Sequence, residues 1–187
     1  ASGPAGTFHH DTERCIVDTE HGWSAVHRQY HDGMMDGFVA TNEPHGERAL
    51  TYFDQSDIPF YHALATTFGI GDRYFCSVLG PTWPNRMYLM AGTSFGLAHN
   101  TFVLGDQRAT PVQHIFRRLD DAGVTWKDYG NGIRMLQFFP YYGIVRAETR
   151  ARLASLDDLQ RDLAAGTLPP FYIPIPFSAV LLIFAIA

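Results

Sequence analysis

A hydroxyl residue just before a proline-started helix is the feature of this sequence best suited to chemistry. Thr82 precedes Pro84, whose φ is preset for a first helical turn and whose missing N–H is not needed there. Good helix formers follow as far as Gly92, which predicts a helix over residues 84–91. Free amides and the positive end of the helix dipole gather at such a position, where they bind phosphate and favour an ionised hydroxyl. Thr82 is therefore a candidate nucleophile, although spacing alone favours a simple helix N-cap.

Two polar residues follow Thr82 in the first turns of the same helix. The guanidinium of Arg86 could hold a phosphate through two hydrogen bonds, and Asn85 lies beside it. Arg86 could equally pair with a buried carboxylate, and that structural role is the interpretation we favour. Asn85 and Arg86 are kept as candidate substrate-binding residues.

Histidines provide the candidate acid–base groups. His21 follows Asp18 in a compact polar and aromatic run, and a histidine there could steady phosphoryl oxygens or protonate a leaving alkoxide. A structural histidine is the alternative, and spacing alone favours it. His27 and His31 lie at helical spacing, but no Cys or Glu nearby completes a metal-ligand set. The run His9-His10-Asp11 is an equally weak metal-site candidate, with a solvated turn as its alternative.

Composition excludes some partners. The 187 residues are 46% hydrophobic and 18% charged, with a net charge of −5 and no basic tract, so no nucleic-acid partner is expected. Cys15 and Cys76 are expected to be buried free thiols rather than a bridge. The N-terminal residues have no signal-peptide pattern. The apolar run Phe177–Ala187 has about half of the ~20 residues that cross a bilayer, so we expect no membrane span and at most surface contact.

Hydrophobic spacing predicts alternating helices and short strands. Helices are expected over 23–30, from a cap at Ser56 or Asp57 to Gly69, and over 84–91, 111–122 and 155–165. Strands are expected over 71–79 and 124–129. This alternation predicts an α/β fold with parallel strands, in which ligands bind beyond the carboxyl ends of the strands. Thr82 would lie at such a place, between a strand and a helix.

Several runs in this sequence resemble the bacterial phosphoesterase family, which contains non-specific phospholipases C and related acid phosphatases of the alkaline-phosphatase-like superfamily. The resemblance extends from about residue 9 to residue 170, and the Pro-Thr-x-Pro-Asn-Arg element is its most specific part. The runs that carry it are Asp18–Trp23, Gly33–Phe38, Asp57–Ala65, Gly71–Ser77, Gly80–Arg86 and Ile115–Lys127.

The resemblance implies a three-layer α/β/α fold, incomplete in this chain, and a phosphoric-ester hydrolase in which Thr82 attacks phosphorus. It implies that Thr82 also binds a divalent metal ion, that His21 assists the phosphoryl oxygens or the leaving group, and that the enzyme is secreted or periplasmic. The substrate would be a phospholipid or another phosphate ester. A partial phosphoesterase domain over residues 1–170 and an atypical apolar tail over 171–187 are the expected organisation.

Some family elements have no counterpart in this sequence. The early Glu-Asn pair and the downstream paired aspartates that would hold the metal are absent. We therefore expect that this chain alone does not bind the metal tightly and hydrolyses esters feebly at most. The alternative is a non-catalytic fragment that only binds a partner or a lipid surface. A small metal-binding module built on the histidines is a third and less favoured hypothesis.

Overall fold

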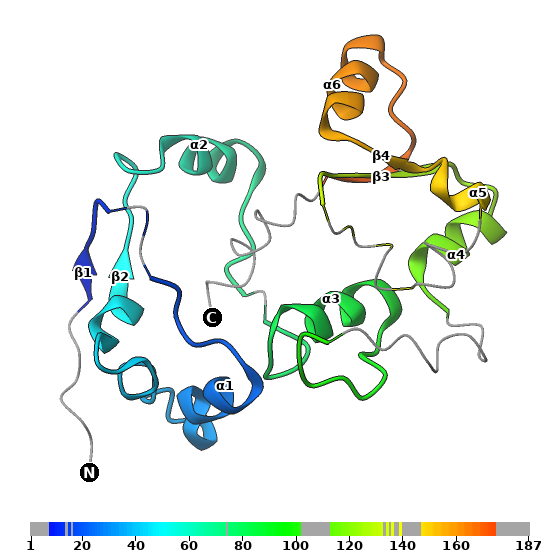
Figure 1. The fold of residues 1–187 in the computed structure, drawn as a ribbon. Coiled ribbons are helices and arrows are strands. Elements are labelled where there is room, and N and C mark those ends of the chain that lie inside the picture. The colour runs from blue at the N-terminus through cyan, green and yellow to red at the C-terminus, as the bar shows by residue number, and fades with distance from the viewer. Residues whose placement is uncertain are drawn as a thin grey trace. The chain divides into compact units, whose positions relative to one another are not determined.

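The computed structural model describes residues 8–13, 15, 17–73, 75–101, 113–132, 134, 136, 139 and 147–174, which fall into two compact units (Figure 1). The N-terminal unit comprises residues 1–74 and 78–81, and the C-terminal unit comprises residues 75–77 and 82–187. The predicted apolar run 177–187 lies outside the described residues. A domain boundary at residue 170 stays a prediction.

Short elements joined by turns build the N-terminal unit. They are β1 (His9–His10), α1 (Trp23–Tyr30), η1 (His31–Gly33), η2 (Ala40–Asn42), η3 (Gly46–Leu50), β2 (Thr51–Tyr52) and α2 (Pro59–Phe68), the three η elements being 3₁₀ helices. β1 and β2 run parallel, with His9 opposite Thr51 and His10 opposite Tyr52 (Figure 1). This pairing connects segments that are about forty residues apart in the chain.

A close approach of two backbone segments requires a glycine in this unit. A Cβ added at Gly37 would lie 2.1 Å from the carbonyl oxygen of Arg28 in α1. The Gly37 N–H also donates to the carbonyl oxygen of Gln29 at 3.3 Å. Any side chain at position 37 would therefore push the chain away from α1.

The C-terminal unit has a small sheet with helices around it. Its elements are α3 (Thr82–Ala91), α4 (Ile115–Asp121), β3 (Trp126–Tyr129), α5 (Ala147–Arg150), β4 (Leu153–Ala154), α6 (Leu156–Ala165) and β5 (Phe171–Pro174). The strand order is β4-β3-β5, and both pairings are parallel. Helices mixed with parallel strands confirm the predicted α/β class, while the three-layer arrangement stays a prediction.

An apolar cluster forms the centre of the C-terminal unit. Its most buried members come from α3, α4, β3, β5 and the segment after β3, and they are Met87, Met90, Phe116, Trp126, Leu136, Phe139 and Ile173. Burial of this many large apolar side chains is the dominant favourable term in folding. The cluster places α3, and with it Thr82, on a packed support.

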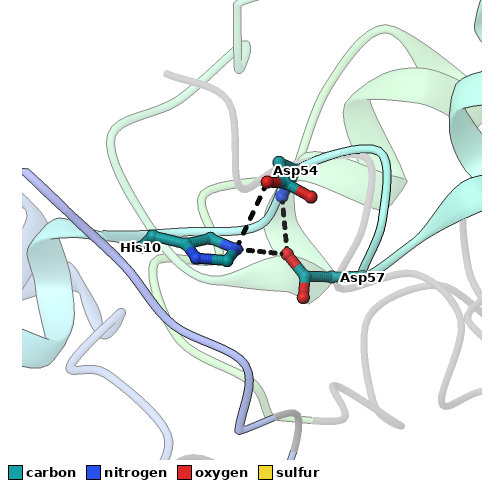
Figure 2. A group of neighbouring side chains, drawn as sticks. All are labelled: His10, Asp54 and Asp57. Carbon is teal, nitrogen blue, oxygen red and sulfur yellow. Dashed lines mark hydrogen bonds and ion pairs between the residues drawn. The ribbon is translucent and has the colours of Figure 1, made fainter.

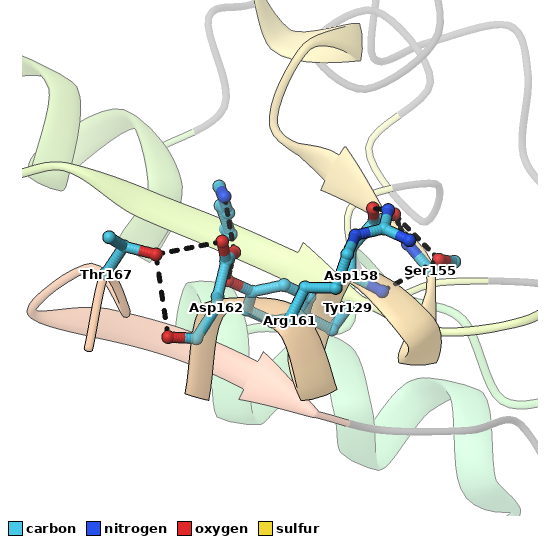
Figure 3. A network of polar contacts seen from close by, with 7 residues as sticks. Tyr129, Ser155, Asp158, Arg161, Asp162 and Thr167 are labelled. Atoms are coloured by element: carbon cyan, nitrogen blue, oxygen red, sulfur yellow. Dashed lines mark hydrogen bonds and ion pairs between the residues drawn. The ribbon is translucent and has the colours of Figure 1, made fainter. Parts of the chain in front are cut away.

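Asp162 connects α6 to the central strand β3 (Figure 3). Its carboxylate accepts hydrogen bonds from the hydroxyl of Tyr129 and, at 2.5 Å, from Nζ of Lys127. Thr167 donates to the other carboxylate oxygen at 3.1 Å. These partners, Lys127 first, lower the pKa of Asp162 to about 2, so the carboxylate is ionised near neutral pH.

The ends of α6 match the prediction from sequence. The Ser155 hydroxyl accepts from the Asp158 N–H while the Asp158 carboxylate accepts from the Ser155 N–H, which is a capping box. Gly166 ends the helix with a φ of 65°, a left-handed conformation that favours glycine.

Three predicted elements differ from the structure. The strand over 71–79 is wrong, because the described residues there form turns and bends, and the Ser77 N–H bonds to the Asn85 side chain instead of a neighbouring strand. The helix predicted from residue 111 begins at Ile115. The ring of His114, the N-cap residue, accepts the Arg117 N–H at 3.2 Å. Residues 111 and 112 lie outside the described residues.

The cap predicted for α2 is also wrong. Ile58 is the N-cap residue and provides no side-chain hydrogen bond. The Asp57 carboxylate instead accepts the Asp54 N–H at 2.8 Å and contacts His10, so it is directed away from the helix. Gly69 ends α2 as predicted.

Cys15 and Cys76 are free thiols, as predicted, but Cys15 is exposed and Cys76 is only partly buried, so their predicted burial is wrong. In the part of the chain that the structure describes, every helix is too short or too polar to cross a bilayer.

Candidate functional site

Thr82 is the first residue of α3, and its side chain is half-buried. The helix begins two residues earlier than predicted, which places Pro84 at its third position. Proline is accepted there because the first four N–H groups of a helix have no partner within it. The next amide, of Trp83, donates to Oδ1 of Asn100 at 2.9 Å. Thr82 therefore lies at a helix N-terminus, at the end of an irregular segment rather than of a strand.

Asn85 and Arg86 are both buried, with 5% and 3% of their surfaces exposed. Oδ1 of Asn85 accepts the Ser77 N–H at 3.0 Å, so Asn85 holds the loop that leads into Thr82. Burial lowers the pKa of the Arg86 guanidinium from its usual value. These contacts give Asn85 a structural role, and direct contact of either residue with substrate stays a prediction.

His21 belongs to the N-terminal unit, whereas Thr82 belongs to the C-terminal unit. The His21 Nδ1 lies 2.8 Å from the carbonyl oxygen of Thr19 and 3.6 Å from a carboxylate oxygen of Asp18. The ring is about half exposed. The structure thus brings Thr82, Asn85 and Arg86 together on α3, while proximity of His21 to Thr82 stays a prediction.

A histidine and two carboxylates come together in the N-terminal unit, and Figure 2 shows them facing one another. The Nε2 atom of His10 lies 2.6 Å from Oδ2 of Asp57 and 3.5 Å from Oδ2 of Asp54. His10 lies on β1, and the two aspartates lie between β2 and α2. We call these three residues the His10 cluster.

The electrostatics of the His10 cluster follow from its hydrogen bonds. The bond to Asp57, and then the nearby carboxylate charges, raise the pKa of His10, although partial burial opposes them. The hydroxyl and the N–H of Ser56 both donate to Oδ1 of Asp54, which lowers the pKa of that carboxyl. The ionised form of Asp54 is therefore favoured, beside a histidine whose protonated form is favoured.

The sequence pattern predicts only part of this cluster. It groups His10 with its immediate neighbours and predicts that Asp57 or Ser56 caps a helix. Residue 10 is far from residues 54 and 57 along the chain, so no local spacing predicts that they meet. The parallel pairing of β1 with β2 brings them together.

The metal implied at Thr82 can be tested against the residues around it. Among the described residues, the His10 cluster is the one group of three or more His, Cys, Asp or Glu side chains close enough to share an ion. Thr82 is not part of it. Metal binding at Thr82 therefore stays a prediction.

Comparison with known proteins places these features in a family. Residues 4–175 match the Phosphoesterase family. Phospholipase C B of Mycobacterium tuberculosis is 32% identical over 209 residues, covering 96% of this chain and 38% of that protein. A non-hemolytic phospholipase C of Burkholderia pseudomallei is 34% identical over 209 residues (89% of this chain, 29% of that protein). Non-specific phospholipase C5 of Arabidopsis thaliana is 29% identical over 157 residues (81% and 30%).

The chain belongs to the Phosphoesterase family, as the motif around Thr82 predicted. It spans about a third of the length of these relatives.

Proposed function

We propose that this protein acts in the hydrolysis of phosphoric esters, with Thr82 as the nucleophile. The observation that carries the proposal is the half-buried hydroxyl residue at the first position of α3, in a member of the Phosphoesterase family. The similarity to proteins named phospholipase C favours a phospholipid or a related phosphate ester as substrate. It also favours hydrolysis over the alternative of a non-catalytic binding fragment.

The proposed reaction has two displacements at phosphorus. Oγ1 of Thr82 forms a bond to phosphorus while the bond from phosphorus to the leaving alcohol oxygen breaks, and the hydroxyl proton passes to solvent. His21 gives a proton to the departing alkoxide. The oxygen of a water molecule then bonds to phosphorus while the bond from phosphorus to Oγ1 breaks, which releases the phosphate product. One proton of that water goes to Oγ1 and restores the hydroxyl, and the other returns to His21. The N-terminal end of α3 favours the negative charge of the ester throughout.

A divalent metal ion would lower the hydroxyl pKa and neutralise the phosphoryl oxygens. Because the Glu-Asn pair and the downstream paired aspartates that the family resemblance implies as metal ligands have no counterpart in this sequence, we propose that this chain does not bind such an ion tightly there and that its turnover is slow. Because the chain belongs to the Phosphoesterase family, we also propose a three-layer α/β/α fold and a secreted or periplasmic location.

A single substitution tests the role of Thr82. Thr82→Val removes the nucleophilic oxygen with almost no change of shape, and Thr66→Val, on the exposed side of α2, is a matched control. We expect slow hydrolysis of nitrophenyl phosphorylcholine or nitrophenyl phosphate by the wild type and Thr66→Val. We expect at least a hundredfold loss in Thr82→Val, which corresponds to about 3 kcal/mol of transition-state stabilisation.

Mass spectrometry of the acid-quenched reaction should find phosphate or phosphocholine attached to Thr82. Excess Zn²⁺ or Mg²⁺ should not raise the rate substantially. Equal rates in Thr82→Val and the wild type, or no hydrolysis by the wild type, would overturn the proposal.

A further inference from the structure

We propose that His10, Asp54 and Asp57 form a binding site for a divalent transition-metal ion, Zn²⁺ being the best fit. This site lies in the N-terminal unit and does not depend on the proposed role of Thr82. It would connect β1 to the segment between β2 and α2 (Figure 2).

The distances suit a small ion with nitrogen and oxygen ligands. The three ligand atoms all lie within 4.8 Å of one another. Tetrahedral Zn²⁺ with bonds of about 2.0–2.2 Å separates neighbouring ligand atoms by about 3.3–3.5 Å. The pair His10 Nε2 and Asp54 Oδ2 is already 3.5 Å apart. His10 Nε2 and Asp57 Oδ2 are 2.6 Å apart. They would have to move apart by less than about 1 Å when the ion replaces the proton that they share.

Hydrogen bonds hold the ligands in place without an ion. The backbone of the His10 segment is fixed by the β1–β2 pairing, and the Asp11 N–H donates to the Tyr52 carbonyl oxygen at 3.1 Å. Asp57 is buried, with 8% of its surface exposed, and accepts the Asp54 N–H. Asp54 receives both Ser56 donors on Oδ1, so that its other oxygen, Oδ2, faces His10. Such outer contacts orient metal ligands and raise affinity.

Charge and ligand type select the ion. Two carboxylates and a neutral imidazole carry a charge of −2, which a divalent cation neutralises. An imidazole with two carboxylates suits Zn²⁺ and its neighbours, whereas Ca²⁺ and Mg²⁺ require more oxygen ligands. The His10 and Asp54 side chains are partly exposed, so water can complete the coordination.

The decisive comparison is between two adjacent histidines. His10→Gln removes the proposed ligand, whereas His9→Gln changes the exposed neighbour on the same strand and is the matched control. The metal-free chain is titrated with Zn²⁺ against a chromophoric chelator, and with Co²⁺ followed by visible absorption. We expect one Zn²⁺ per chain and a tetrahedral Co²⁺ spectrum.

We expect affinity to fall at least tenfold in His10→Gln and in Asp54→Asn, and to stay within twofold in His9→Gln. Asp54 is exposed enough that its variant should fold even if an Asp57 variant does not. Absence of stoichiometric binding, or a spectrum and affinity unaltered by His10→Gln, would overturn the proposal. Because metal binding is read directly, a failure of the hydrolase proposal would leave this result unchanged.

Discussion

The two compact units differ in what fills their interiors. Seven large apolar side chains cluster in the C-terminal unit, including Phe116 and Trp126. Buried side chains described in the N-terminal unit are instead mostly polar, with Gln29, Asn42 and Asp57 alongside Ala25. The C-terminal unit is therefore stabilised mainly by apolar burial, and the N-terminal unit largely by specific hydrogen bonds.

The polar interior of the N-terminal unit is built from contacts between side chains and backbone. Nε2 of Gln29 donates to the Glu20 carbonyl oxygen at 2.7 Å, and Oδ1 of Asn42 accepts the Glu20 N–H at 2.8 Å. Hydrogen bonds contribute little net free energy each but are costly to leave unmade. An added cross-link should therefore raise the free energy of unfolding of this unit relatively more. The ion proposed at the His10 cluster would be such a cross-link, so its binding should also stabilise the unit.

The largest expected effect is in the apolar cluster. Phe116 is fully buried and contacts Trp126, with ring centroids 4.7 Å apart. Phe116→Ala should lower the free energy of unfolding of the C-terminal unit by about 3–5 kcal/mol, because it removes apolar burial and leaves a cavity. Hydrogen exchange should show lost protection in β3 and α4 and much less change in α1. Equal losses in both units would mean that they unfold together.

A pH-dependent effect is expected at Asp128 in β3, the one buried charge on the central strand. Burial raises the pKa of Asp128 to about 6, and its Oδ2 accepts the Leu136 N–H at 3.0 Å. Because the pKa of Asp128 is higher in the folded than in the unfolded state, the folded state favours the protonated carboxyl. The resulting contribution to the free energy of unfolding is complete below about pH 4 and is lost as the pH rises through 6.

Asp128→Asn should therefore gain stability relative to the wild type between pH 4 and pH 8, by roughly 3 kcal/mol over that range. Denaturant titrations at both pH values measure the difference, and Asp157→Asn, at the exposed start of α6, is the control. A constant difference between the wild type and Asp128→Asn across this range would contradict the assignment.

A smaller effect is expected at the polar centre of the N-terminal unit. Asn42 is 1% exposed and also donates to the Phe38 carbonyl oxygen at 2.8 Å. Asn42→Ala should destabilise this unit by about 1–3 kcal/mol, because it leaves buried backbone groups without partners. Hydrogen exchange at Glu20 and in η2 should report the loss, while β3 stays protected. An unchanged N-terminal unit would show that its polar interior contributes little.

Local sequence signals determined several features of this chain. Ser155 with Asp158 and Gly166 set the ends of α6, and the residues after Thr82 formed a helix that stops before Gly92, as predicted. These signals work because caps and glycine turns depend on residues within one turn of helix. The motif around Thr82 also identified the family, since it is a short and specific run.

Tertiary structure decided the features that depend on distant partners. Local spacing predicts a helix cap at Asp57, but its carboxylate contacts His10. It also predicts a strand over residues 71–79, but the Ser77 N–H there donates to the Asn85 side chain. A carboxylate or a backbone N–H near a helix can satisfy its hydrogen bonds locally or with a remote partner, and local spacing does not distinguish the two. The His10 cluster exists only because β1 and β2 pair across about forty residues, and that pairing is a property of the folded chain.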